Sequence, residues 1–188
     1  MIVALLGNKG HGKDSFAGLL VRHLGFSAIA FGDALYTETA RRYGVSVEFL
    51  RERATKESPS ERLGGLSPRQ ALQRLGMAAR EADPEVWIHP VRRFVAEQSG
   101  HGGVVITDVR LPNEARFAQS VDAVFVRIRR PGLPPSGDAH ITETALAAFP
   151  CDLEIVNRED DPDGMLAQWL EFARQSDPMC EALRSARL

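Results

Sequence analysis

The chain has 188 residues, a hydrophobic fraction of 44%, 26% charged residues and a formal net charge of -2. This length suits one domain with a sizeable core, and the composition is ordinary for a soluble globular protein. The charge provides no global attraction to nucleic acid or to an anionic membrane, so polynucleotide binding would require a local basic cluster.

The two cysteines, Cys151 and Cys180, are too few and too far apart to indicate a zinc site or a disulfide framework. No apolar run reaches the roughly 20 residues that a membrane-spanning helix needs. We interpret the first residues as a core strand and not as a signal peptide. These features favour a cytoplasmic enzyme that has no membrane partner.

Residues 2–6 form an unbroken apolar run, which is typical of a strand buried in a parallel sheet. A glycine-rich stretch, 7–15, follows directly, and residues 16–24 then place apolar side chains at helical spacing. Glycines permit positive φ angles, so that backbone N–H groups can point at phosphate oxygens, and the helix N-terminus adds to the positive field. The alternative is a glycine turn without a ligand. We predict a loop that binds a nucleoside triphosphate through Asn8, Lys9, Gly10, His11, Gly12, Lys13, Asp14 and Ser15.

The residue after Lys13 departs from the usual phosphate-loop pattern. In that pattern a Ser or Thr follows the Gly-Lys pair, and its hydroxyl binds Mg²⁺. Here Asp14 takes that position and the hydroxyl is delayed to Ser15. Either residue is a candidate metal ligand, while Lys13 is the expected catalytic cation on the β and γ phosphates.

A second strand is predicted at residues 27–31, followed by Asp33. Ligands collect at the carboxyl ends of parallel strands, so Asp33 is either a substrate-binding residue or a helix N-cap. Beyond it, up to residue 100, no strand is evident. We therefore predict a single domain, 1–188, whose core consists of 1–32 and 101–188, with 33–100 as a helical substrate-binding insertion.

Helices in this insertion are predicted at 37–43 and 47–53, followed by an exposed loop at 57–65. A further helix begins after Ser67 as the N-cap, with Pro68 at its first position. We expect its buried stripe to consist of Leu72, Leu75 and Ala79.

The polar side of that helix carries Arg69, Gln73 and Arg80 on roughly one face. Arginine binds phosphate bidentately and glutamine can read the edge of a base, so all three are candidate substrate-binding residues. The alternative is a solvated face with salt bridges. The next helix, predicted to be capped by Asp83, contains Trp87, which is either core or stacked on a base.

Asp108 ends a third predicted strand, 104–108. In phosphate-loop enzymes an acidic residue at this position usually orients Mg²⁺, so Asp108 is a candidate metal ligand and substrate contact. Arg110 and Glu114 follow at the same edge of the sheet, where they form either part of the site or a structural pair.

A fourth strand is predicted at 123–128, with Arg129 and Arg130 at its end. The Pro- and Gly-rich loop that follows is typical of a lid, and we assign the lid region to 129–143. His140, within it, is interpreted as structural. A fifth strand at 152–157 and a helix at 163–174 complete an α/β fold, a five-stranded parallel sheet flanked by helices.

Several segments of the chain resemble the phage-type deoxynucleoside monophosphate kinases, which belong to the P-loop nucleoside monophosphate kinase superfamily. The matching segments are Gly-Lys-Asp-Ser at 12–15, Phe-Gly-Asp-Ala-Leu at 31–35, the stretch 67–76 with Arg80 and Trp87, and Thr-Asp-Val-Arg-Leu-Pro-Asn-Glu-Ala at 107–115. Fainter matches occur at 138–143 and 155–157. Together these segments span nearly the whole chain.

The resemblance implies a P-loop NTPase fold and ATP-dependent phosphorylation of deoxynucleoside monophosphates to diphosphates, for bacteriophage DNA synthesis. Residues 9–15 would bind the ATP phosphates and Mg²⁺. The acceptor pocket would contain Asp33, Arg69, Arg80 and Trp87, with Asp108 and Arg110 between the nucleotides and Arg129 and Arg130 as the lid arginines. The expected catalytic set is Lys13, Arg80, Arg110, Arg129 and Arg130.

Two other functions are compatible with the same core. One is a kinase for a hydroxymethylated base in DNA, which would need a general base such as Asp33 and a basic groove. The other is a nucleotide-dependent binding switch with slow turnover. The sequence does not decide which bases are accepted, whether ribose is rejected or whether the protein is a homodimer.

Overall fold

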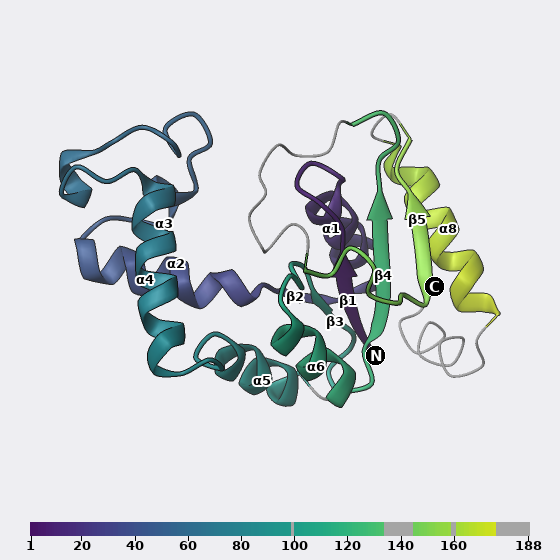
Figure 1. Cartoon of the computed structure of the whole chain (residues 1–188). Coiled ribbons are helices and arrows are strands. Elements are labelled where there is room, and N and C mark those ends of the chain that lie inside the picture. Colours follow the sequence, from purple (N-terminus) through teal and green to yellow (C-terminus); the bar gives the residue numbers. More distant parts are fainter. Residues whose placement is uncertain (99, 134–144, 159–160, 176–188) are drawn as a thin grey trace. The chain divides into compact units, whose positions relative to one another are not determined.

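The computed structural model describes residues 1–98, 100–133, 145–158 and 161–175. It contains two compact units (Figure 1). We call Met1–Ala30 with Arg92–Leu188 the core unit, and Phe31–Val91 the helical unit. The predicted insertion, 33–100, overlaps the helical unit, and its role in binding a substrate stays a prediction.

The core unit contains a five-stranded parallel sheet with the strand order β2-β3-β1-β4-β5. Its strands are β1 (Ile2–Leu6), β2 (Ser27–Ile29), β3 (Val104–Ile106), β4 (Val124–Arg129) and β5 (Leu153–Val156). The predicted α/β fold is confirmed. The predicted second and third strands are too long, because α2 already begins at Phe31 and β3 ends at Ile106.

Two helices pack on the sheet in one apolar cluster, α1 (Lys13–Leu24) and α8 (Pro162–Arg174). Phe16 of α1 meets Trp169 of α8 edge to face, with ring centroids 6.2 Å apart, and both side chains are fully buried. Their cluster includes Leu5 and Ile155 from the strands. This packing holds the beginning of α1 at the carboxyl end of β1.

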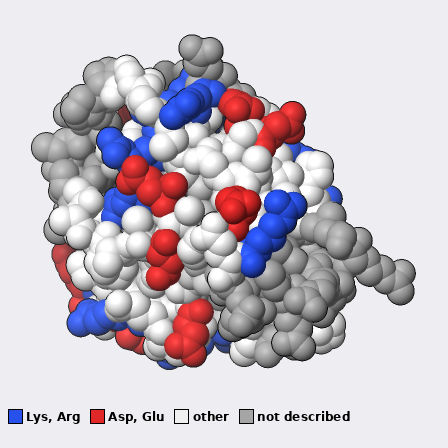
Figure 2. All heavy atoms as spheres, turned by 90° about the vertical axis from the view of Figure 1, so that its right-hand side faces the viewer, with Lys and Arg blue, Asp and Glu red and all other residues white. Residues whose placement is uncertain are grey.

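Acidic and basic side chains are interspersed on the face of the core unit that carries α8 (Figure 2). The exposed ion pairs of this unit include Arg129 with Glu154 and Arg174 with Glu171. α6 (Pro112–Ser120) also belongs to the core unit, and the Arg92 guanidinium lies 5.6 Å from the ring centroid of its Phe117. In the described part of the chain, no helix has the length and apolar character needed to cross a bilayer.

The helical unit contains α2 (Phe31–Tyr43), α3 (Val47–Arg51), the short 3₁₀ helix η1 (Glu61–Leu63) and α4 (Pro68–Ala82). Its core is built from Leu50, Leu63 and Ala71. The stretch predicted as an exposed loop therefore contributes Leu63, which is 1% exposed. The residues of α4 that are buried are Pro68, Ala71, Leu72 and Gly76, so the predicted Leu75 and Ala79 are only half-buried.

Two helix starts differ from the prediction. α2 begins before Asp33, so that this residue lies in the first helical turn and is not the N-cap. α5 (Ile88–Glu97), whose first residues belong to the helical unit, begins after Trp87. Asp83 accepts a hydrogen bond from the Glu85 backbone through its side chain (2.9 Å), which forms a turn over the next residues and delays the helix.

α4 begins as predicted, with Ser67 as its N-cap and Pro68 at the first position. The Gln70 N–H donates to Ser67 Oγ at 3.2 Å, and the Ser67 N–H donates to Gln70 Oε1 at 2.9 Å. These reciprocal bonds satisfy two backbone donors that the helix cannot satisfy itself.

We expect Ser67→Ala to lower the free energy of unfolding by about 1 kcal/mol, because the Gln70 N–H loses its acceptor at the start of α4. Denaturant unfolding, followed by circular dichroism, measures this change. Ser58→Ala, at an exposed site in the same unit, is the control and should leave stability unchanged. Equal stability of the two variants would contradict the proposed role of the cap.

Candidate active site

The glycine-rich loop between β1 and α1 lies against the ends of β4 and β5. Gly7, Gly10 and Gly12 have φ angles of 136°, 83° and 100°. A Cβ atom at Gly7 would lie 2.5 Å from the Ile128 carbonyl oxygen, and one at Gly12 would lie 2.4 Å from Asn157 Nδ2. Both the backbone angles and the available space therefore require glycine at Gly7 and Gly12.

Lys13 follows this loop as the first residue of α1 and is only 7% exposed. Its Nζ donates to the carbonyl oxygens of Gly7 at 2.6 Å and Asn8 at 3.0 Å. The N-cap of α1 is Gly12, which supplies no side-chain acceptor to the first-turn N–H groups. A cation, a helix N-terminus and a tight glycine turn together form an arrangement that can bind an anion.

His11 contacts β4 and the residue that follows β5. Its Nδ1 lies 3.1 Å from the Ile128 carbonyl oxygen, and its own carbonyl oxygen accepts a hydrogen bond from Asn157 Nδ2 at 3.0 Å. Asn157 was not among the predicted site residues. The sequence signals for it are its place directly after an apolar strand and the faint family match at 155–157, neither of which shows what its side chain contacts.

The segment after β3 runs beside the beginning of the glycine loop. β3 pairs with β1, and the Val109 N–H donates to the Leu5 carbonyl at 3.3 Å, so the backbone continues along β1 beyond the strand. The half-buried Asp108 lies on this segment. Its position at the carboxyl edge matches the prediction, and its role as a metal ligand stays a prediction.

The side chain of Glu114 binds the backbone of this segment. Glu114 is 4% exposed. Its carboxylate accepts hydrogen bonds from the Arg110 N–H at 2.8 Å and from the Leu111 N–H at 3.0 Å. These contacts favour the structural alternative for Glu114, which shapes the turn that carries the half-buried Arg110.

Arg129 is the last residue of β4 and pairs with Glu154, with 3.1 Å between Nη1 and Oε1. The predicted lid region, 129–143, therefore begins on the sheet. Arg130 follows and is half-buried. His140, with the rest of 134–144, lies outside the described residues.

Asp33, in the helical unit, belongs to a small charged cluster that the sequence analysis missed. It pairs with Arg51, with 2.5 Å between Oδ1 and Nη2. The Arg51 guanidinium and Lys56 Nζ lie 4.9 and 5.3 Å from the ring centroid of Tyr36, and Lys56 also donates to the Tyr36 hydroxyl at 2.6 Å. A signal available in the sequence was the spacing of Asp33 and Tyr36, which places them on one side of a helix.

The predicted polar residues of α4 differ in their surroundings. Arg69 is half-buried and pairs with Glu57, with 2.5 Å between Nε and Oε1, as the ion-pair alternative expects. Gln73 is exposed and Arg80 is half-buried. Trp87 is 6% exposed, and its Nε1 has no hydrogen-bond partner within the described ranges.

The predicted site residues are divided between the two units. The helical unit contains Asp33, Arg69, Gln73, Arg80 and Trp87, and the core unit contains Lys13, Asp108, Arg110, Arg129 and Arg130.

The described residues expected to bind Mg²⁺ do not form a complete metal site by themselves. Asp14 and Ser15 are exposed in the first turn of α1, and the described residues include no cluster of three or more metal-binding His, Cys, Asp or Glu side chains. Mg²⁺ commonly binds through one or two carboxylates together with phosphate oxygens and waters. The residues present therefore fit a metal that arrives with a nucleotide.

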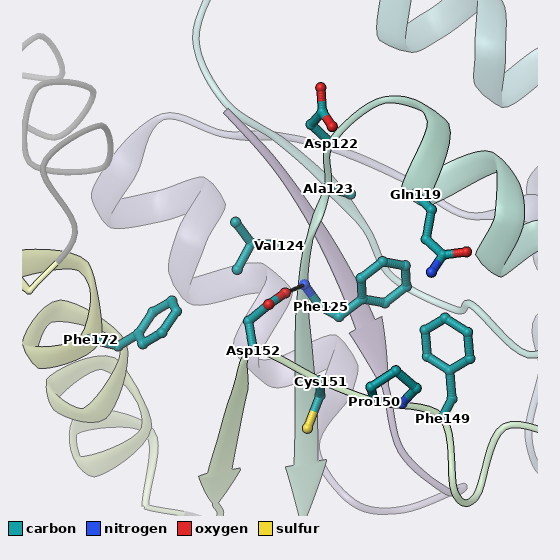
Figure 3. A pocket seen from close by; sticks show the side chains of 10 residues that line it. All are labelled: Gln119, Asp122, Ala123, Val124, Phe125, Phe149, Pro150, Cys151, Asp152 and Phe172. Atoms are coloured by element: carbon teal, nitrogen blue, oxygen red, sulfur yellow. Dashed lines mark hydrogen bonds between the residues drawn. The ribbon is translucent and has the colours of Figure 1, made fainter.

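A hollow of about 640 Å³ lies at the opposite edge of the sheet, where β4 and β5 begin (Figure 3). Phe125 and Phe149 face each other across 5.0 Å between ring centroids, and Asp152 Oδ2 accepts a hydrogen bond from the Phe125 N–H at 2.7 Å. Because all strands are parallel, this hollow is remote from the glycine loop at their carboxyl ends. It is separate from the candidate anion site.

Comparison with known proteins relates the chain to one family. The family model described as deoxynucleotide monophosphate kinase matches residues 34–165. A protein of Acanthamoeba polyphaga mimivirus, named "Putative deoxynucleotide monophosphate kinase", is 30% identical over 173 residues, which cover 85% of this chain and 89% of that protein. The chain therefore belongs to the deoxynucleotide monophosphate kinase family.

Proposed function

We propose that the protein transfers the γ-phosphoryl group of ATP to the 5′-phosphate of a deoxynucleoside monophosphate, which yields the diphosphate. The observation that carries this proposal is the glycine loop with a buried Lys13 and an uncapped helix start, beside Asp108, in a chain of this family. The name of the mimivirus relative supports the acceptor class.

The donor side of the reaction belongs to the core unit. Loop N–H groups would hold the phosphates, and Lys13 would exchange the Gly7 and Asn8 carbonyls for the β and γ phosphate oxygens. Mg²⁺ supplies charge neutralisation on the same phosphates when it is bound. Asp14, Ser15 and Asp108 would hold it, directly or through water.

The acceptor side belongs to the helical unit in this proposal. Arg69 and Arg80 would bind the 5′-phosphate, with Asp33, Gln73 and Trp87 contacting the nucleoside. Arg69 would leave its ion pair with Glu57 to do so. The acceptor oxygen is already anionic at neutral pH, so the transfer needs positioning and charge neutralisation more than a strong base.

The transferring phosphoryl group develops negative charge on its equatorial oxygens. Arg80, Arg110, Arg129 and Arg130 are the cations proposed to neutralise it together with Lys13. Water must be excluded at this stage because an open site would hydrolyse ATP.

We expect Lys13→Ala to lower kcat for monophosphate phosphorylation by about 10²-fold or more, since the transition state loses a preorganised cation. A coupled assay of ADP formation, with a deoxynucleoside monophosphate as acceptor, measures the rate. Arg22→Ala, at an exposed cation in the last turn of the same helix, is the control and should retain the rate. A Lys13→Ala protein of normal activity would exclude this mechanism.

We expect Arg69→Ala to raise KM for the monophosphate by about tenfold to a hundredfold, because a hydrogen-bonded charge on the acceptor phosphate is lost. KM for ATP should stay within about twofold. Arg74→Ala, at an exposed arginine of the same helix, serves as the matched control. A rise in KM for ATP alone would place Arg69 on the donor side and contradict this assignment.

An acceptor screen separates the proposal from the two alternatives. We expect labelled ATP to phosphorylate at least one natural deoxynucleoside monophosphate, and each ribonucleotide is tested beside its deoxy form. Product on hydroxymethylated duplex DNA alone would identify the DNA-modifying alternative. ADP formation that does not depend on any acceptor would favour the switch. Among the described residues on the face in Figure 2, acidic side chains lie between the basic ones, so this part of the surface does not support a basic groove for a DNA strand.

A further inference from the structure

Asn157 connects the last strand of the sheet to the glycine loop. It follows β5 directly and is 1% exposed. Its backbone N–H donates to the Arg129 carbonyl at 2.8 Å, so the pairing of β4 with β5 continues one residue beyond the strand. The side chain is thereby held at the carboxyl edge of the sheet, where the loop lies.

The Asn157 amide contacts two successive loop residues. Nδ2 donates to the His11 carbonyl at 3.0 Å, and it lies so close to Gly12 that a Cβ there would be 2.4 Å away. The His11 carbonyl and the Gly12 N–H belong to the same planar trans peptide, in which they point in opposite directions. A carbonyl bound to Asn157 therefore directs the Gly12 N–H away from β5.

β4 contacts the side chain of His11, the first residue of this peptide. His11 Nδ1 lies 3.1 Å from the Ile128 carbonyl, the atom against which Gly7 also packs. The His11 side chain and the His11 carbonyl are thus bound by different strands. With both contacts in place, rotation of the His11–Gly12 peptide requires that at least the Asn157 bond be broken.

The oxygen of this amide is unused within the described ranges. Asn157 Oδ1 is buried and has no partner in the described part of the chain. A buried acceptor without a partner destabilises the fold, so stability alone does not favour asparagine at this position. The Nδ2 contact to the loop is what an apolar residue of similar size could not provide.

We propose that Asn157 is a positioning residue for ATP, which presents the Gly12 N–H to the phosphates by holding the His11–Gly12 peptide. This role rests on the proposed function of the loop. It assigns to Asn157 an effect on donor binding that is separate from the binding of the acceptor.

The test compares Asn157→Ala with Gln168→Ala. Gln168 is a side-chain amide at the same end of β5, where it accepts from the Val156 N–H at 2.9 Å and donates to the Val156 carbonyl at 3.1 Å. Gln168 lies on α8, so these bonds connect α8 to β5, and no described contact joins its side chain to the glycine loop. Both variants remove one amide next to β5, but only Asn157→Ala removes the restraint on the loop.

ATP binding is measured by calorimetry in the absence of an acceptor, together with thermal unfolding of each protein. We expect Asn157→Ala to weaken ATP binding about tenfold and to leave the acceptor KM within about twofold, with faster amide hydrogen exchange at residues 10–13. Asn157→Asp keeps the shape of the side chain but replaces the N–H donor by an oxygen. This variant should therefore bind ATP no better than Asn157→Ala does. Gln168→Ala should lower stability and leave ATP affinity unchanged.

Unchanged ATP affinity in a folded Asn157→Ala protein would overturn the proposal, as would an equal loss in Gln168→Ala. A wild-type protein that binds no ATP would overturn both this inference and the proposed function. If the wild type binds ATP, shows the expected Asn157 effect and phosphorylates no monophosphate, the proposed function fails and the positioning role stands.

Discussion

The close packing of the glycine loop against the ends of β4 and β5 is the constraint on which the rest of the site depends. Gly7 meets a main-chain carbonyl and Gly12 meets a side-chain amide, each at a distance that excludes a Cβ atom. The loop can lie this close only because the three positive φ angles occur at glycine. The position of α1, and with it that of Lys13, follows from this contact.

The two units contribute different chemistry to the proposed reaction. The core unit offers backbone donors, a buried ammonium group and carboxylates, which suit a metal-bound polyphosphate. The helical unit offers arginines that already have carboxylate partners, as Arg51 has Asp33 and Arg69 has Glu57. In the proposed reaction a monophosphate would have to compete with these partners, so recognition in this unit would depend on a ligand that offers more than one oxygen.

The sheet could be predicted from sequence because each strand is a short apolar run between turn residues, and a strand buried on both faces needs no finer pattern. Element ends were less predictable, since Phe31 suits both a strand and the buried start of α2. The glycine loop is a local motif and was found. Asn157 was missed because its partner, His11, is distant in sequence and only the folded sheet brings them together.

In the proposed function, the hydrogen bonds of Lys13 bear on how long a nucleotide would stay bound. The ammonium group would leave the Gly7 and Asn8 carbonyls when phosphate enters and regain them when phosphate departs, so the exchange would gain less free energy than a new partner for a buried, unpaired charge. Lys13 would then select for a polyanion and add comparatively little to the lifetime of its complex. Release of ADP after each turnover would be easier for the same reason.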